Sequence, residues 1–128
     1  MAQTLEQKRA QHAWEKAKEG VSAFGKEYVN SAKALPALIM NSGLMQVMAY
    51  LRDKGRDKKN RKEKRHEMLA RHLREWLHEQ CGTPSDFEGF MTCLQQAEPR
   101  DFQHITTEAM AWLRWLRQMA PARQGGTD

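Results

Sequence analysis

The side chains that could do catalytic or metal chemistry gather between residues 72 and 81. His78 and Cys81 are three residues apart, so on a helix they would lie one turn apart and could act as two metal ligands. No second pair matches them, and a closed zinc site takes four ligands. A Cys81 nucleophile with His72 or His78 as its base would lack an orienting third group and an oxyanion pocket. Glu75 and Glu79 have the spacing of ordinary surface carboxylates. We therefore expect no catalytic activity, no metal and no cofactor.

An abrupt change from uncharged to basic sequence at residue 52 says more about function than these side chains do. Residues 34–51 contain no charged side chain, whereas residues 52–65 contain nine basic and three acidic ones, which is a local charge of +6. The whole chain carries +5, so the rest of it sums to −1. A positive charge this localised is typical of a surface that binds a polyanion.

The basic segment, residues 52–65, is open to three interpretations. Lys58, Arg61, Lys62 and Arg65 are spaced so that on a helix they would form a row, which could follow nucleic-acid phosphates without reading the sequence. The same residues could form a solvated face that only keeps the protein soluble, or a surface that docks on an acidic partner subunit. We favour nucleic acid because this segment carries the entire net charge.

The composition predicts an all-α protein in the cytoplasm. Only three Val and two Ile occur, and the abundant Ala, Leu, Met, Gln, Glu, Lys and Arg lose little side-chain freedom in a helix. Pro36 and the Asn-Ser-Gly turn at 41–43 interrupt the uncharged run, which favours two short buried helices over a membrane span. Cys81 and Cys93, without a recognisable signal peptide, indicate free thiols in a reducing compartment.

The spacing of apolar residues predicts a single-domain helical bundle of about six helices. Their expected ranges are residues 5–34, 36–40, 44–54, 61–80, 85–97 and 106–120. The first helix is long, because apolar positions keep a helical phase through Gly20 and Gly25, and we expect it to bend at these glycines. The folded domain spans residues 1–120, and residues 121–128 are expected to form a disordered tail.

Two pairs of residues have the spacing of capping boxes. Thr4 with Gln7 is expected to open the first helix, and Ser85 with Glu88 the fifth. The last helix is expected to begin at Thr106 or Thr107, after a turn around Phe102.

A family likeness covers most of the chain. YVNSAKALPALI at residues 28–39, NSGLMQ at 41–46 and AYL at 49–51 resemble the signature of the small helical subunit of the type III-B CRISPR effector, the Cmr complex. QKRA at 7–10 and EAMAWLRWL at 108–116 are also similar to that family. The basic insert between residues 51 and 68 has no counterpart in the likeness, so its role is inferred from charge alone.

The resemblance implies a non-catalytic subunit of an RNA-guided complex in antiviral defence. Copies of such a subunit would stack head to tail and line the groove that holds the guide RNA (crRNA) paired with its target, while other subunits cleave. The implied partners are guide and target RNA, other Cmr subunits and further copies of the chain. No membrane and no small-molecule substrate are expected.

The candidate nucleic-acid contacts combine the basic segment with two basic residues of the family-like strings. They are Arg9, Lys33, Arg52, Lys54, Arg56, Lys58, Lys59, Arg61, Lys62, Lys64 and Arg65. Arg9 and Lys33 are equally suited to local ion pairs. The alternative function is a stand-alone helical regulator with a helix from Arg61 onward in the major groove of DNA, although no helix-turn-helix connection lies near that residue.

Overall fold

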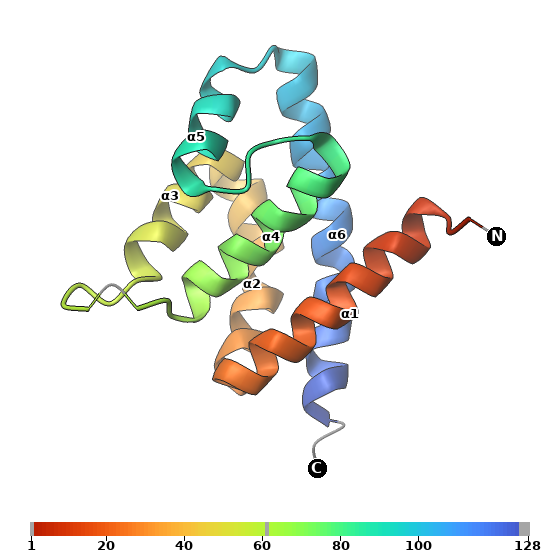
Figure 1. Ribbon diagram of the computed structural model, residues 1–128, viewed down its shortest axis with the longest axis vertical. Coiled ribbons are helices and arrows are strands. Elements are labelled where there is room, and N and C mark those ends of the chain that lie inside the picture. Colours follow the sequence, from red (N-terminus) through yellow and green to blue (C-terminus); the bar gives the residue numbers. More distant parts are fainter. Residues whose placement is uncertain (1, 61, 126–128) are drawn as a thin grey trace.

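A computed structural model describes residues 2–60 and 62–125, and within them six α-helices and no strand (Figure 1). The helices are α1 (Leu5–Phe24), α2 (Lys26–Ser42), α3 (Leu44–Lys54), α4 (Arg65–Cys81), α5 (Phe87–Gln96) and α6 (Pro99–Gly125). The predicted all-α bundle is therefore confirmed. The predicted bounds of α3 are also those of the structure.

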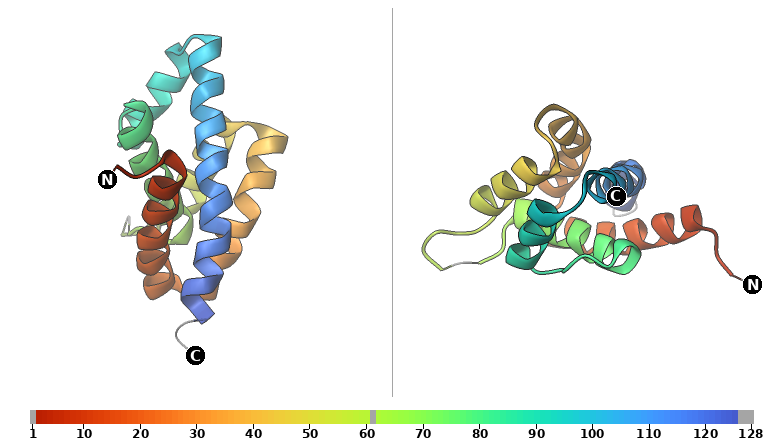
Figure 2. Two further views of the ribbon diagram at one scale, coloured as in Figure 1. Left: turned by 90° about the vertical axis from the view of Figure 1, so that its right-hand side faces the viewer. Right: turned by 90° about the horizontal axis from the view of Figure 1, so that it is seen from above.

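Helix α6 is the element around which the others are arranged. It packs against α1, α2 and α4, and α3 packs on α4 and α2. Helices α1 and α2 lie on different sides of α6, and α4 packs against both of them (Figure 2). The loop between α3 and α4 projects from the side of this body (Figure 1).

The core is built from the apolar faces that these helices turn toward one another. Its largest fully buried side chains are Trp112, Tyr28, Phe90 and a group of leucines. Burying such side chains contributes roughly 1.5–3 kcal/mol each. The core therefore fixes the frame that carries the projecting loop.

The expected single helix over residues 5–34 is two helices in the structure. Gly25 has φ +56° and ψ −131°, a conformation that residues with a side chain rarely adopt, and it ends α1 and begins α2. The chain turns back there, and the ring of Tyr28 in α2 fills the space beside Gly20 in α1, where a Cβ atom would lie 2.4 Å from the ring. The helical spacing of apolar residues continues from α1 into α2 because both helices pack on the same core.

Several helix ends differ from those expected. Pro36 lies inside α2 and does not begin a separate helix. The N-cap of α5 is Asp86, which accepts a hydrogen bond from the Gly89 N–H at 2.7 Å, and not Ser85. Helix α6 begins at Pro99, and the Thr106 hydroxyl donates to the Phe102 carbonyl within it at 3.0 Å. The Thr4–Gln7 capping box is present as predicted.

The uncharged run and the C-terminal segment are both helical in the structure. Residues 34–51 are divided between α2 and α3, and no helix in the described ranges combines the length and apolarity needed to cross a bilayer. Helix α6 extends to Gly125, past Pro121, where the sequence predicts the start of a tail. The rest of that expected tail, residues 126–128, lies outside the described residues.

Candidate nucleic-acid interface

The middle of the basic segment is a hairpin, not the helix expected from residue 61. We call residues 55–60 and 62–64 the basic hairpin; Arg61, a predicted contact, lies outside the described residues. Arg56 and Glu63 form an antiparallel bridge. Asp57 N–H donates to the Lys62 carbonyl at 3.0 Å, and Lys64 N–H donates to the Gly55 carbonyl at 2.7 Å. The predicted helical row of Lys58, Arg61, Lys62 and Arg65 is therefore wrong, because Lys58 and Lys62 lie on an ordered hairpin.

Side-chain oxygens hold the tip of the hairpin. The Asp57 carboxylate accepts from the N–H groups of Lys59 and Asn60 at 2.8 and 3.1 Å, and the Asn60 side chain accepts from Lys62 N–H at 2.9 Å. Bonds from Asn60 and Lys59 lower the pKa of Asp57 below its ordinary value. The tip is therefore ordered by local bonds, which Asx side chains commonly supply in turns.

A buried carboxylate anchors the root of the hairpin. Glu67 is fully buried, and its Oε1 accepts from Arg52 at 3.1 Å and from Arg74 at 2.8 Å. The Arg52 guanidinium also lies 4.7 Å from the centre of the Phe87 ring. Arg52, a predicted nucleic-acid contact at the end of α3, therefore uses its guanidinium for contacts within the protein.

Arg71 of α4 connects the hairpin to the rest of the bundle. It forms two hydrogen bonds to Glu63, of 2.8 and 3.1 Å, and a third of 2.7 Å to Glu19 of α1. Glu75 lies 3.3 Å away on the same helix. Hydrogen bonding to Glu63 raises the pKa of Arg71 further above its already high ordinary value. Arg71 is thus a permanent cation that clamps three carboxylates.

The lysines of the segment differ from its arginines. Lys54, Lys59, Lys62 and Lys64 are exposed, and none of them pairs with an acidic side chain among residues 2–60 and 62–125. Lys58 lies 3.4 Å from Asp53, but both side chains are largely exposed, so this pair contributes little. The cations that remain available to a polyanion are therefore the lysines of the projecting hairpin and Lys54 at the end of α3 (Figure 1).

The other predicted contacts have separate surroundings. Arg65, at the start of α4, forms an ion pair of 3.2 Å with Glu27 of α2, and Arg56 is half-buried. Lys33 is exposed on α2, outside the hairpin. Arg9 forms two hydrogen bonds of 2.7 Å to Glu108, which is the local ion pair that the sequence offered as the alternative to an RNA contact.

His78 and Cys81, the candidate metal ligands, have contacts that explain them as parts of the fold. His78 Nδ1 lies 2.8 Å from the Thr83 carbonyl oxygen, and burial raises the pKa of the Cys81 thiol, which makes it a poor nucleophile. Among the described residues, no cluster of three or more His, Cys, Asp or Glu side chains is arranged to hold a metal ion.

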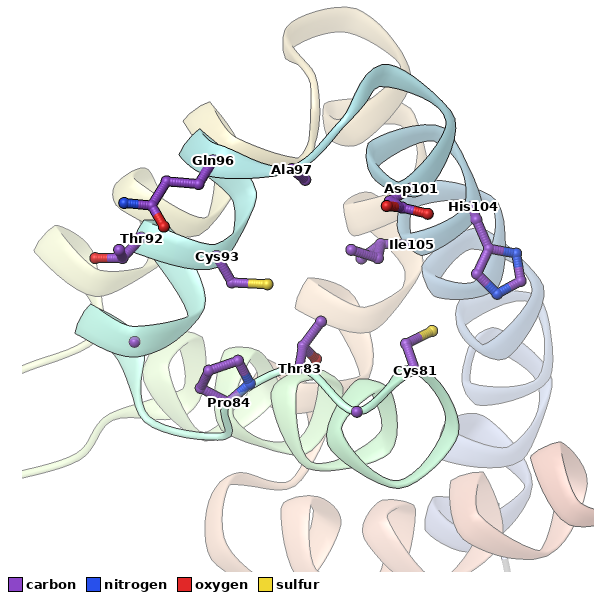
Figure 3. A pocket seen from close by; sticks show the side chains of 12 residues that line it. Cys81, Thr83, Pro84, Thr92, Cys93, Gln96, Ala97, Asp101, His104 and Ile105 are labelled. Atoms are coloured by element: carbon purple, nitrogen blue, oxygen red, sulfur yellow. The ribbon is translucent and has the colours of Figure 1, made fainter.

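Cys81 and Cys93 line a cavity of about 590 Å³ between α4, α5 and α6 (Figure 3). Thr83, Gln96, Asp101 and other polar groups share its wall, and no Lys or Arg does. The cavity is therefore separate from the cationic surface and unsuited to phosphate.

Comparisons with known proteins decide the family. The family model described as CRISPR-associated protein (Cas_Cmr5) matches residues 5–123. The chain belongs to the Cmr5 family. It is 28% identical over 120 residues to a "CRISPR system Cmr subunit Cmr5" of Thermus thermophilus, an alignment that covers 93% of this chain and 95% of the relative.

The fold agrees with the family assignment. The crystal structure of a CRISPR-associated Cmr5 family protein from Thermus thermophilus matches with a TM-score of 0.73 and 27% identity, over 94% of this chain and 97% of that one. This Cmr5-family chain is thus a small subunit of the type III-B Cmr complex, as its family-like strings indicated. The alternative of a stand-alone DNA regulator is not supported, and the helix it required begins only at Arg65, with Glu67 to Arg74 mostly buried.

Sequence reasoning missed the residues that hold the hairpin. Glu67 and Arg74 are buried although both are charged. Their spacing of seven residues is a signal that they share one face of α4. Nothing in that spacing shows that Arg52, on another helix, joins them.

Proposed function

We propose that this chain is a non-catalytic scaffold of the Cmr complex that holds the backbone of the guide–target RNA duplex through the lysines of the basic hairpin and through Lys54, which directly precedes it. The observation that supports this most is the division within the segment. Its arginines at 52 and 65 are tied to glutamates, while four lysines stay exposed and unpaired with acids in the described ranges. Lysine is a flexible point charge, suited to phosphates and without the planar geometry that reads bases. The guide would supply specificity by pairing, so the protein needs none.

The lysines can be tested together. Replacing Lys54, Lys59, Lys62 and Lys64 with Gln removes four charges from exposed positions and should leave the free energy of unfolding nearly unchanged. We expect duplex RNA binding at 50 mM salt to weaken by roughly tenfold or more, and the salt dependence of the logarithm of affinity to become shallower by up to about four. Fluorescence anisotropy over 50–200 mM salt measures both.

A matched variant removes the same charge elsewhere. Lys8, Lys18, Lys26 and Arg117 are exposed on other helices, and their replacement with Gln should leave most of the affinity intact. Equal loss in both variants would show that binding follows net charge, and unchanged binding in the lysine variant would refute the proposed contact.

We further propose that copies of the chain stack in the complex, beside other Cmr subunits. Five large apolar side chains of the described ranges are exposed: Leu38, Met40 and Tyr50 on α2 and α3, and Leu5 and Trp14 on α1. Leu38 and Met40 belong to α2, and Leu5 and Trp14 belong to α1, which lies on a different side of α6 (Figure 2). Two different surfaces on one molecule suit a head-to-tail contact, which extends into a stack when it does not close. The free thiols of Cys81 and Cys93 suit the cytoplasm as the place of assembly.

A further inference from the structure

The hairpin joins the body of the protein at a point where the backbone is tightly packed. Gly55, its first residue, is buried. A Cβ atom on Gly55 would lie 2.3 Å from the Glu67 nitrogen and 2.4 Å from the Leu51 carbonyl oxygen. Both are backbone atoms, which cannot turn aside as a side chain does. The root of the hairpin is therefore pressed directly against the first turn of α4 and the last turns of α3.

The same place holds three charged side chains from two helices. One oxygen of Glu67 accepts from Arg52, at the end of α3, and from Arg74, in the middle of α4. Arg74 also donates to the Ser85 carbonyl at 2.8 Å. Both guanidinium groups lie over the Phe87 ring, at 4.7 and 6.0 Å. This group, which we call the root triad (Arg52, Glu67 and Arg74), fixes α3, α4 and the start of α5 relative to one another.

Buried ion groups are weak contributors to stability compared with apolar packing, so a triad at this position needs another physical reason. Their hydrogen bonds are directional, and they favour one arrangement of the groups they join. Arg52 belongs to α3, which precedes the hairpin, and Glu67 and Arg74 belong to α4, which follows it. The triad thus joins the two helices that flank the hairpin. Its geometry therefore sets the direction in which the hairpin projects.

We propose that the root triad and Gly55 position the basic hairpin for RNA, so that they determine RNA affinity without touching RNA. This inference rests on the proposed function of the hairpin lysines. A hairpin held in one direction presents its lysines to phosphates without losing much conformational freedom on binding. A loosened root leaves every lysine in place but requires the RNA to order the hairpin.

Two variants that keep the charge of the protein test the positioning role. Gly55→Ala introduces the impossible Cβ contacts, and Arg52→Lys keeps the cation but loses the planar guanidinium that joins Glu67 and Phe87. We expect each to weaken duplex RNA binding about tenfold, the equivalent of one or two backbone residues that must be ordered on binding. Anisotropy on the full-length protein, at a temperature where circular dichroism shows it folded, gives the affinity.

Hydrogen exchange reports on the hairpin itself. The Asp57 and Lys64 amides donate to Lys62 and Gly55 across the hairpin, so they should exchange faster in both variants. The control is Gly20→Ala, which forces a clash with the Tyr28 side chain between α1 and α2 and adds no atom at the root of the hairpin. It should lower stability while leaving RNA affinity and these two amides unchanged.

The outcomes separate this inference from the proposed function. If the four-lysine variant loses binding while Gly55→Ala and Arg52→Lys bind like wild type, the hairpin binds RNA and the positioning role is refuted. Wild-type affinity of Arg52→Lys alone would show that Arg52 acts as a simple cation toward phosphate, which also overturns the inference. If Gly55→Ala does not fold, Arg52→Lys decides. An equal affinity loss in Gly20→Ala would assign the effect to general destabilisation and refute it as well.

Discussion

At the scale of single residues, arginine and lysine have different roles in this protein. Arg9, Arg52, Arg71 and Arg74 form two or more hydrogen bonds or ring contacts each within the bundle. A planar guanidinium can satisfy two carboxylate oxygens at once, whereas an ammonium group is a hydrated point charge. The lysines of the hairpin consequently stay in solvent, where a second molecule can reach them.

His72 makes stability depend on pH. It is fully buried, its Nδ1 lies 2.7 Å from the Tyr28 hydroxyl and its Nε2 lies 3.0 Å from Glu19. Because Glu19 can only accept, the neutral ring carries its proton on Nε2 and accepts from Tyr28 on Nδ1. Burial lowers the pKa of His72 to about 4, against the attraction of Glu19 and with minor repulsion from Arg71 and Lys16.

The free energy of unfolding should therefore fall as the pH falls. The unfolded chain, with a His pKa of 6.5, binds more protons between pH 6.5 and 4, so the stability from neutral His72 is complete at pH 7.5 and lost across that window. At pH 5 this loss is about 2 kcal/mol. Urea unfolding at pH 7.5 and 5.0 measures it.

Two substitutions distinguish His72 from other titrating groups. His72→Asn should be less stable at pH 7.5 but lose less on acidification, whereas replacing the exposed His104 with Asn should leave the pH profile as in wild type. An undiminished loss in His72→Asn would assign the pH dependence to other groups. His12 is the next candidate, because burial also lowers its pKa to about 4.

Arg9 should matter for folding and not for RNA. Burial alone would raise the pKa of Glu108, but hydrogen bonds from Arg9 and Trp76 bring it below its ordinary value. Arg9→Gln leaves this buried carboxylate without its cation, at a cost of about 3 kcal/mol. Urea unfolding should show that loss, and anisotropy under folding conditions should show wild-type affinity. A loss of affinity comparable to that of the four-lysine variant would instead make Arg9 an RNA contact.

At the scale of elements, Gly25 decides whether the N-terminal region is one helix or two. Its positive φ turns α2 back along the core, and its N–H donates to the Val21 carbonyl at 2.8 Å. A continuous helix of 30 residues would be about 45 Å long, more than the diameter of a compact domain of this size. The turn is therefore what allows both helices to pack on α6.

Gly25→Ala should strain this turn. We expect the free energy of unfolding to fall by about 1–3 kcal/mol, because the conformation is one that an Ala residue strongly disfavours. Gly125→Ala, where no atom lies within 4 Å of the added Cβ, is the control and should be neutral. Thermal and urea unfolding compare the two. Wild-type stability of Gly25→Ala would show that the chain can break between α1 and α2 without this backbone conformation.

At the scale of the whole molecule, part of the exposed apolar surface lies beside a cation, because Leu38 and Tyr50 line one pocket with Arg65. The hairpin projects from one side (Figure 1), while Met40, the most exposed large apolar residue of the described ranges at 78%, lies in the last turn of α2. A large apolar side chain this exposed is a candidate for a contact surface. The proposed stacking contact at Met40 and the proposed RNA contact at the lysines therefore involve different residues and can be tested separately.

Met40→Glu should weaken the proposed stacking without affecting folding. A charge in an apolar contact would lose its hydration, so sedimentation velocity with a guide–target duplex long enough for several copies should show smaller particles than wild type. Stability should change by less than about 0.5 kcal/mol at such an exposed position. Gln103→Glu, an exposed change on α6, is the control. Particles of wild-type size from Met40→Glu would exclude this surface from the stack.

The sequence alone determined the properties that depend on local pattern and composition. The all-α class, the Thr4–Gln7 cap, the bounds of α3, the localised charge and the family-like strings all follow from neighbouring residues, because propensity, capping and spacing act over a few positions. The division of the N-terminal helix did not follow, because the apolar phase is the same on both sides of Gly25.

Only the tertiary structure decided which basic residues are available. Arg65 meets Glu27 across 38 positions, Arg71 meets Glu19 across 52, and Arg9 meets Glu108 across 99. These pairs exist because the helices cross where they do, and no local pattern encodes that crossing. Charge counted along the chain therefore located the cationic segment, whereas the arrangement of the helices separated its anchoring arginines from its free lysines.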